Sequence, residues 1–331
     1  MANVALVGSG SWGTAIAHLL AGKGCSVTMW AHSEKTVRAI NTQHRNERYL
    51  PDVNLDGVVA TTSFEEALHD ADCLVMVCPS SYLRDVAQQL AGYVRASLPV
   101  IVLSKGIEAK SGYTMVEVLE DVLGNDDRLA CLSGPNHAEE VSRGLPAATV
   151  VASANEQCAK YFQELFGTHS FRVYTSSDVY GVELCAASKN IIAIANGMCC
   201  AMKLGDNASA SLMTRGLAEV TRLVIALGGD GRTCLGLAGV GDLIATCSSK
   251  HSRNRALGEL LVEGGTLEEF EAKTHMVAEG AVACRTVTEL AERFDVEMPI
   301  AQAVRRVLWE GLDPHVITEE FFDRPSKSEV E

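Results

Sequence analysis

The sequence has little positive charge. Its 331 residues include 28 lysines and arginines against 42 aspartates and glutamates, which gives a net charge of −14 at pH 7. A surface for nucleic acid or for anionic membranes needs basic patches, so this balance argues against both kinds of partner. Any site for a phosphate must therefore be built locally, from a few basic side chains and backbone N–H groups.

Long apolar runs and a disulfide framework are also missing. No stretch is long and apolar enough to span a bilayer, and the short apolar run at the N-terminus is broken by Gly8 and Gly10, unlike a signal peptide. The eleven cysteines are odd in number, scattered and without a C-x-x-C pair. This pattern is typical of free thiols in a reducing compartment, so we expect a cytoplasmic protein without membrane insertion.

Short β-rich runs alternate with amphipathic stretches over the first half of the chain, a pattern typical of parallel sheets with crossover helices. The second half reads as helical. We predict an α/β fold: a Rossmann-like, doubly wound, mainly parallel sheet in residues 1–178, followed by an all-helical domain in residues 179–331. The predicted strands are residues 3–7, 26–30, 73–78, 100–103, 129–132, 148–152 and 171–174. The predicted helices include residues 64–70, 83–94, 114–123, 181–204, 209–227, 253–263, 279–294 and 300–309.

The first predicted strand runs directly into Gly8-Ser-Gly10-Ser-Trp-Gly13 and then into an apolar helix. In this order Gly8 takes a tight turn, Gly10 leaves room for a pyrophosphate, and Gly13 lets the helix pack on the strand. The helix N-terminus then presents N–H groups and a partial positive charge. The pattern predicts a dinucleotide site; the alternative is a glycine-rich turn without a ligand.

The tip of the second predicted strand decides between NAD and NADP. An NAD-specific domain usually has a carboxylate there for the ribose 2′-hydroxyl. This chain has His32 and Ser33 instead, with Lys35 and Arg38 nearby. We therefore expect NAD or NADP, with NADPH plausible as the preferred reductant. In the alternative, His32 caps the next helix and Glu34 binds the ribose.

Two further strand ends carry candidate site residues. Lys105 follows the carboxyl end of the predicted strand 100–103, where a cation can hold phosphate or polarise a carbonyl. The alternative is a solvated surface lysine. Gly134 permits a close backbone approach after the next strand, and the turn aims Asn136 and Ala138 inward. We interpret His137 as structural rather than as a general base.

Lys189 lies in a segment, residues 183–197, that is apolar or small nearly all round and therefore predicts a buried helix. A lysine in such a helix is costly unless it has a partner, and burial lowers a lysine pKa toward the range useful for proton transfer. We predict that Lys189 is the acid–base residue. The alternative is that its side chain extends out to water.

Asp242 and Ser252-Arg253-Asn254 complete the candidates. Three glycines precede Asp242, which suggests backbone close to a ligand, with the carboxylate orienting a hydroxyl or a lysine. Ser252, Arg253 and Asn254 stand at a predicted helix start and together offer the donors that suit a phosphate dianion. The alternative for this cluster is an ordinary N-cap with surface arginines.

These motifs, taken in order, resemble those of the bacterial NAD(P)-dependent sn-glycerol-3-phosphate dehydrogenases over nearly the whole chain. The matching segments are GSGSWGTAIA (8–17), SKG (104–106), SGPNHAEE (133–140), ASKNIIAIANG (187–197), GVGD (239–242), SRNR (252–255) and VAEG (277–280).

The resemblance implies reversible reduction of dihydroxyacetone phosphate to sn-glycerol 3-phosphate for glycerophospholipid synthesis, by a homodimer and without a metal. It implies Lys189 as proton donor and acceptor. The substrate residues would be Lys105, Gly134, Asn136, Lys189, Asp242, Ser252, Arg253 and Asn254. Beside the glycines, the dinucleotide would contact Ser11, Trp12, His32, Lys105, Ala138, Arg253, Val277 and Glu279.

Two other functions stay open at this stage. A dehydrogenase of the same two-domain plan that acts on a β-hydroxyacid would use its arginine for a carboxylate. A dinucleotide-sensing protein without catalysis would bind cofactor only, and a buried lysine such as Lys189 argues against it.

Overall fold

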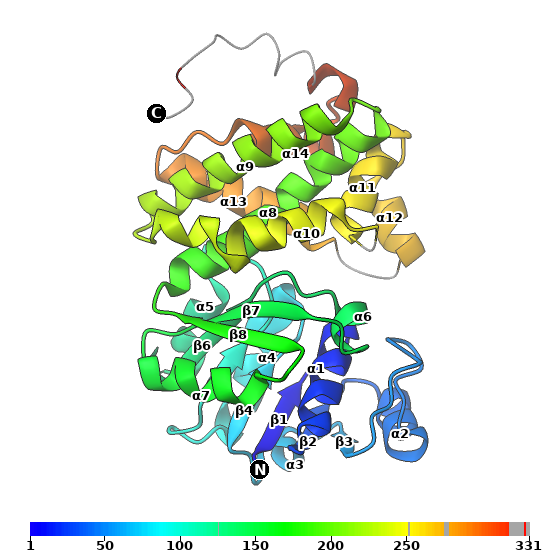
Figure 1. Ribbon diagram of the computed structural model, residues 1–331, viewed down its shortest axis with the longest axis vertical. Coiled ribbons are helices and arrows are strands. Elements are labelled where there is room, and N and C mark those ends of the chain that lie inside the picture. The colour runs from blue at the N-terminus through cyan, green and yellow to red at the C-terminus, as the bar shows by residue number, and fades with distance from the viewer. Residues whose placement is uncertain (125, 251, 275–277, 318–327, 329–331) are drawn as a thin grey trace. The chain divides into compact units, whose positions relative to one another are not determined.

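The computed structural model describes residues 1–124, 126–250, 252–274, 278–317 and 328 (Figure 1). By compactness the chain divides into two units. The first comprises Met1–Ala187 and Val224–Asp242, and the second comprises Ser188–Leu223 and Leu243–Glu331. The predicted division between residues 178 and 179 falls where α8 (Val179–Ala201) begins, and this helix continues without a break past Ala187.

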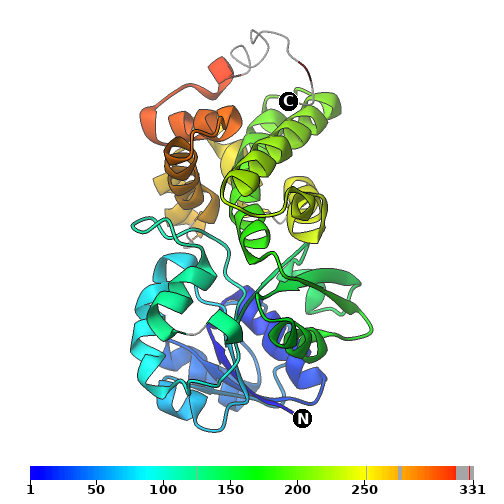
Figure 2. The same ribbon diagram turned by 90° about the vertical axis from the view of Figure 1, so that its left-hand side faces the viewer.

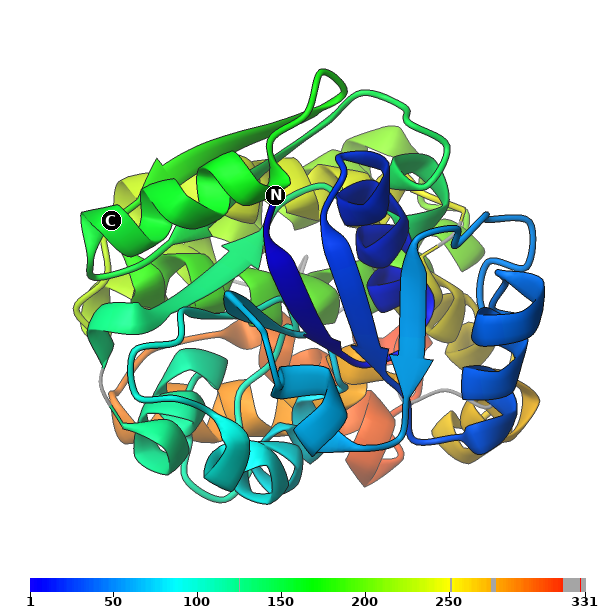
Figure 3. The same ribbon diagram turned by 90° about the horizontal axis from the view of Figure 1, so that it is seen from below.

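The first unit contains one mainly parallel sheet, as predicted. Its strand order is β3-β2-β1-β4-β5-β6-β7-β8, and among the described residues only the β6–β7 pair is antiparallel. Figure 3 shows β1, β2 and β3 side by side. The strands are β1 (Asn3–Val7), β2 (Ser26–Trp30), β3 (Val58–Thr61), β4 (Cys73–Met76), β5 (Val100–Val102), β6 (Leu129–Ser133), β7 (Ala147–Ala152) and β8 (Phe171–Ser176).

The helices of this unit connect the strands. They are α1 (Ser11–Gly22), α2 (Glu34–Gln43), α3 (Phe64–Leu68), α4 (Leu83–Leu90), α5 (Met115–Leu123), α6 (Ala138–Val141) and α7 (Glu156–Phe166). Every residue of β4 is buried, as expected for a central strand covered on both faces. The aromatic rings of Phe162 and Phe166 on α7 belong to the same apolar core as Leu6 of β1 and Ile16 of α1.

From Val179 onward all described elements are helical, which confirms the predicted helical second half. Besides α8 they are α9 (Asp206–Ala226), η4 (Gly231–Leu235), η5 (Leu237–Gly241), α10 (Asp242–Ser248), α11 (Arg253–Val262), α12 (Leu267–Thr274), α13 (Glu279–Arg293) and α14 (Pro299–Glu310). In the second unit α13 packs against α14 (Figure 2).

Helix α8 is apolar on all sides. By length and composition it is the one described helix that could cross a membrane, but 83% of its most apolar window is buried inside the protein. That burial is what the core helix of a folded domain shows. The charged side chains that α8 carries, Glu183 and Lys189, are therefore buried as well.

Several predicted elements differ in their bounds, and some were missed. The predicted strand 73–78 ends at Met76, and the predicted helix 83–94 ends at Leu90, where a 3₁₀ turn follows. No element was predicted at β3, α6, α7, α10 or α12, and α2 was expected only as a helix without bounds. Strand β3 is short and lies at the edge of the sheet. Its exposed residue is the apolar Val59, so apolar and polar residues do not alternate along the strand.

Candidate active site

Backbone packing explains two glycines of the first turn. Gly8 has φ +124°, and a Cβ there would lie 2.7 Å from the Val77 carbonyl oxygen. A Cβ on Gly13 would lie 2.1 Å from the carbonyl oxygen of Gly8, so the helix approaches the turn only because both residues lack side chains. Gly10 differs, since a Cβ there would meet nothing within 4 Å. Open space at Gly10 is what close approach of a pyrophosphate requires.

The N-terminus of α1 fits an anion. Its N-cap is Gly10, which supplies no capping side chain, and the first turn contains no acidic residue. The half-buried Ser11 and Trp12 begin the helix, where backbone N–H groups and the helix dipole favour negative charge. These features suit the phosphates of a dinucleotide.

His32 lies just beyond β2 and its side chain is exposed. The residue that caps α2 is Ser33, whose hydroxyl accepts a hydrogen bond from the Thr36 N–H at 3.5 Å. The capping role proposed for His32 in the alternative is therefore wrong. Glu34 is the first residue of α2 and is also exposed.

Lys105 makes an ion pair rather than extending into water. Its Nζ donates to Asp242 Oδ2 at 2.6 Å and to the Gly134 carbonyl oxygen at 3.3 Å. The side chains of Lys105 and Asp242 are 18% and 4% exposed. Asp242 reaches this position because the turn η5 ends directly before it. The structure thus brings together three predicted site residues from separate parts of the sequence.

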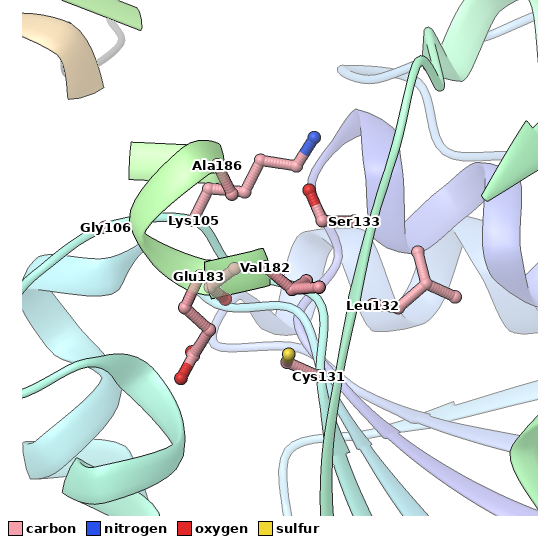
Figure 4. Close-up of a pocket in the computed structure, with 9 residues that line it drawn as sticks. Lys105, Gly106, Cys131, Leu132, Ser133, Val182, Glu183 and Ala186 are labelled. Carbon is pink, nitrogen blue, oxygen red and sulfur yellow. The ribbon is translucent and has the colours of Figure 1, made fainter. Parts of the chain in front are cut away.

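A small cavity of about 10 Å³ lies beside Lys105. In Figure 4 the Lys105 ammonium group extends toward the hydroxyl of Ser133, and the carboxylate of Glu183 points the other way. The Ser133 hydroxyl is buried and has no hydrogen-bond partner among the described residues. The lining residues are Ser104, Lys105, Gly106, Cys131, Leu132, Ser133, Val182, Glu183 and Ala186.

Glu183 holds the start of α8 against the start of α5. Its two carboxylate oxygens accept hydrogen bonds from the Val116 N–H, at 3.1 and 3.3 Å. Burial raises the pKa of this carboxyl group to about 8, because desolvation disfavours the charged form. Glu183 was not among the predicted site residues; the available signal was a second charged residue in the same apolar helix as Lys189.

Asn136 is fixed to the neighbouring strand. Its Nδ2 donates to the Ala148 carbonyl oxygen of β7 at 3.0 Å, while its buried Oδ1 has no partner among the described residues. His137 is the residue before α6, and Ala138 is the buried first residue of that helix. The turn therefore places Asn136 and Ala138 on the same short connection between β6 and β7.

Lys189 is buried, with 7% of its surface exposed. Its Nζ donates to the Thr246 hydroxyl at 2.5 Å. The side chain does not extend to water, so the alternative given for it is wrong. Thr246 lies on α10, one helical turn after Asp242, and was not predicted from the sequence. No local pattern marks a threonine whose partner is more than fifty residues away.

Ser252 is both a helix cap and a site candidate. It is the N-cap of α11, 6% exposed, and its hydroxyl accepts from the Arg255 N–H at 3.3 Å. Arg253 is exposed, whereas Arg255 pairs with Glu259 at 2.9 Å. The capping alternative is correct for Ser252, and Arg255 forms an ion pair along the helix.

Asn254 joins the beginnings of two helices. Its Oδ1 accepts a hydrogen bond from the Gly280 N–H at 3.0 Å, next to the half-buried Glu279 that begins α13. The segment around Glu279 is thereby placed beside the start of α11. Val277, another predicted contact of the dinucleotide, lies outside the described residues.

Comparisons with known proteins identify the family of the chain. Residues 3–159 match a family model described as the NAD-dependent glycerol-3-phosphate dehydrogenase N-terminus, and residues 178–319 match the corresponding C-terminus. A glycerol-3-phosphate dehydrogenase [NAD(P)+] from Corynebacterium urealyticum is 45% identical, over 99% of this chain and 100% of that protein. A relative of the same name from Pelotomaculum thermopropionicum is 45% identical, over 99% and 95%.

Solved structures extend the likeness to three dimensions. The crystal structure of glycerol-3-phosphate dehydrogenase from Coxiella burnetii matches with a TM-score of 0.93 and 37% identity, over 98% of this chain and 99% of that one.

Proposed function

The chain belongs to the NAD-dependent glycerol-3-phosphate dehydrogenase family, and from this premise we propose that it interconverts dihydroxyacetone phosphate and sn-glycerol 3-phosphate with NAD(P)H as reductant. The observation that carries the proposal is the burial of Lys189 with its Nζ held at 2.5 Å by Thr246. A buried, oriented amine is suited to exchanging a proton with a substrate oxygen.

The first turn would hold the dinucleotide. Gly8, Gly10 and Gly13 shape the turn, and the first N–H groups of α1 bind the phosphates. When bound, the nicotinamide ring supplies or accepts the hydride. Other proposed contacts of the dinucleotide are Ser11, Trp12, His32, Lys105, Ala138, Arg253, Val277 and Glu279.

Lys189 would move the proton. As the C2 carbonyl of dihydroxyacetone phosphate is reduced, Lys189 Nζ donates a proton to the forming alkoxide, and it takes the proton back in the oxidative direction. Thr246 fixes the amine of Lys189 by a hydrogen bond at 2.5 Å.

The phosphate of the substrate would bind at the start of α11. Ser252, Arg253 and Asn254 combine a helix N-terminus with a guanidinium group, an arrangement that suits a dianion. Binding energy from this phosphate positions C2 for reaction. Lys105, Gly134, Asn136 and Asp242 are the further proposed contacts.

A β-hydroxyacid dehydrogenase of the same plan is the competing function, and substrate choice separates the two. Oxidation of NADH and of NADPH would be followed with dihydroxyacetone phosphate and, separately, with a 3-oxo acid. We expect turnover with the triose phosphate alone. Faster turnover of the 3-oxo acid would overturn the proposal.

Two arginines two residues apart on α11 provide a matched test of the phosphate contact. Arg253→Ala should raise the KM for dihydroxyacetone phosphate about 10- to 100-fold, since hydrogen bonds to charged groups contribute about 1.5–3 kcal/mol. Arg255→Ala, which breaks the ion pair with Glu259, should leave that KM unchanged. An equal effect of both substitutions would contradict the assignment of Arg253.

We also propose that the enzyme is a cytoplasmic homodimer that supplies glycerophospholipid synthesis. All eleven cysteines are free thiols, in keeping with a reducing compartment. Ile225 and Leu235 are 58% and 72% exposed, which is apolar surface that a second copy could cover. Light scattering after gel filtration should give twice the mass of one chain.

A further inference from the structure

We propose that Asn46 is a positioning residue for the dinucleotide: it holds the Gly8–Gly13 turn in its binding shape. This inference rests on the proposed use of that turn for NAD(P). Asn46 lies in the connection between α2 and β3 and belongs to none of the motifs found in the sequence. It does not itself contact the phosphates in this proposal, but acts through the backbone of the turn.

The amide of Asn46 is fully engaged. Its Nδ2 donates to the Ser9 carbonyl oxygen and to the Thr14 hydroxyl, both at 2.8 Å. Its Oδ1 accepts from the Tyr49 N–H at 3.3 Å. Asn46 is 1% exposed and Thr14 is fully buried, so water cannot readily replace these bonds. One side chain thereby ties the turn and the first turn of α1 to a segment more than thirty residues away.

The bond to Ser9 orients the peptide that precedes Gly10. The Ser9 carbonyl and the Gly10 N–H belong to one planar trans peptide, so they point in opposite directions. Fixing the carbonyl on Asn46 therefore aims the Gly10 N–H away from Asn46, on the side opposite that contact. Gly10 is also the residue whose missing side chain leaves open space. The orientation and the open space occur at the same residue.

The chain reverses just before Asn46, which brings the amide back to α1. Helix α2 ends at Gln43, and the capping residue His44 that follows has a left-handed conformation with φ 52°. A second contact fastens the same segment to α1, because His18 Nδ1 lies 2.7 Å from the Asn54 carbonyl oxygen. Of these two contacts, the one made by Asn46 reaches the glycine turn.

Loss of this tie should weaken dinucleotide binding by letting the turn sample other shapes. If the binding shape is populated about a tenth of the time, the measured Kd rises about tenfold. Asn46→Ala removes the amide nitrogen that donates both hydrogen bonds. Asn46→Asp keeps the side-chain volume and the oxygen that accepts from the Tyr49 N–H, but replaces the amide nitrogen with an oxygen. The second variant decides the matter if the first does not fold.

Two controls match these variants. Asn41→Ala removes an asparagine of α2 that makes two hydrogen bonds to the Ala60 backbone of β3, at 2.7 and 2.8 Å, without reaching the turn. His18→Ala removes the contact between His18 of α1 and the Asn54 carbonyl oxygen, which does not involve the turn. Both test whether any loosening of this region lowers affinity.

The measurement is calorimetric titration of each purified full-length variant with NADH and with NADPH, in the absence of substrate, together with a thermal melt. We expect the Asn46 variants to raise both Kd values about tenfold or more, with the two controls within about twofold of wild type. At saturating NADPH, the KM for dihydroxyacetone phosphate should be unchanged.

Wild-type Kd values in Asn46→Asp, or an equal loss in Asn41→Ala, would overturn the inference while leaving the proposed function intact. A wild-type chain that binds neither dinucleotide would overturn both. Turnover of a different substrate would overturn the proposed function alone, because the titration contains no substrate.

Discussion

Lys189 and Glu183 are buried beside Thr246 and the N-terminus of α5, and the partly buried Lys105 pairs with Asp242. The two lysines could be predicted from the sequence, because a strand end and an apolar helix are local patterns. Asp242 was also predicted, as a carboxylate that orients a hydroxyl or a lysine, but its pairing with Lys105 and the role of Thr246 could not be predicted. A hydrogen bond between distant segments depends on how the chain folds back, and the same reason hides Asn46.

His32 should set the cofactor preference. His32→Asp places a carboxylate at the tip of β2, where it can bind a ribose 2′-hydroxyl but repels a 2′-phosphate. We expect kcat/KM for NADPH to fall about 10- to 100-fold, a change of about 1.4–2.8 kcal/mol, with the value for NADH equal or higher. Glu34→Gln is the control and should change neither value. A larger loss for NADH than for NADPH would contradict the role of His32.

Glu183 should make stability depend on pH. An acid whose folded pKa is raised to about 8 keeps its proton in the folded state when the unfolded chain has already lost it. The protonated Glu183 therefore contributes its full share to the free energy of unfolding below the unfolded pKa of about 4.3. This share is lost as the pH rises toward the folded pKa, at up to about 1.4 kcal/mol per pH unit.

Glu183→Gln removes this titration and keeps an acceptor for the Val116 N–H. Denaturation of both proteins at a series of pH values should show the variant gaining stability relative to wild type between about pH 5 and pH 8. A difference that does not change over this interval would show that Glu183 keeps its ordinary pKa in the folded protein.

Among the strands and helices, those marked by a local sequence pattern could be predicted. Strands β1 and β2 were predicted with their observed bounds, since Gly8 directly follows the first apolar run and Gly24 stands just before the second strand. Helix α7 and strand β3 were missed. Helix α7 follows an Asn155 cap, a start signal that apolar periodicity alone does not contain. Strand β3 is defined mainly by its pairing with β2. Tertiary contacts, rather than local preference, fix such elements.

Close packing of α8 on α11 should be sensitive to a single methyl group. A Cβ at Gly258 of α11 would lie 2.0 Å from the Ile194 carbonyl oxygen of α8. Alanine is favoured over glycine in a helix by about 1 kcal/mol, but overpacking typically costs about 1–3 kcal/mol or more. We expect Gly258→Ala to lower the free energy of unfolding, as measured by urea denaturation.

Gly22, at the exposed end of α1, is the control for this substitution. A Cβ there would meet nothing within 4 Å, so Gly22→Ala should leave the free energy of unfolding unchanged or raise it. Stabilisation by Gly258→Ala would mean that the two helices do not approach as closely as described.

For the whole molecule, the sequence predicts an N-terminal sheet and a helical second half because the change of pattern is sharp near residue 178. The compact units do not follow this division of the sequence, since Val224–Asp242, from the helical half, belongs to the first unit. This return carries Asp242 to Lys105, and glycines in the turn before α10 permit it. We propose that 1–178 and 179–331 are the domains by sequence, with α8 joining them.

The proposed reduction of dihydroxyacetone phosphate depends on proton exchange by Lys189. The substitution Lys189→Met removes the amine, and kcat is measured at saturating NADPH and substrate, with the Kd for NADPH determined alongside. We expect kcat to fall about 10²–10⁴-fold, the usual contribution of a general acid, with the Kd unchanged. A variant that keeps near-normal kcat would show that Lys189 does not exchange the proton.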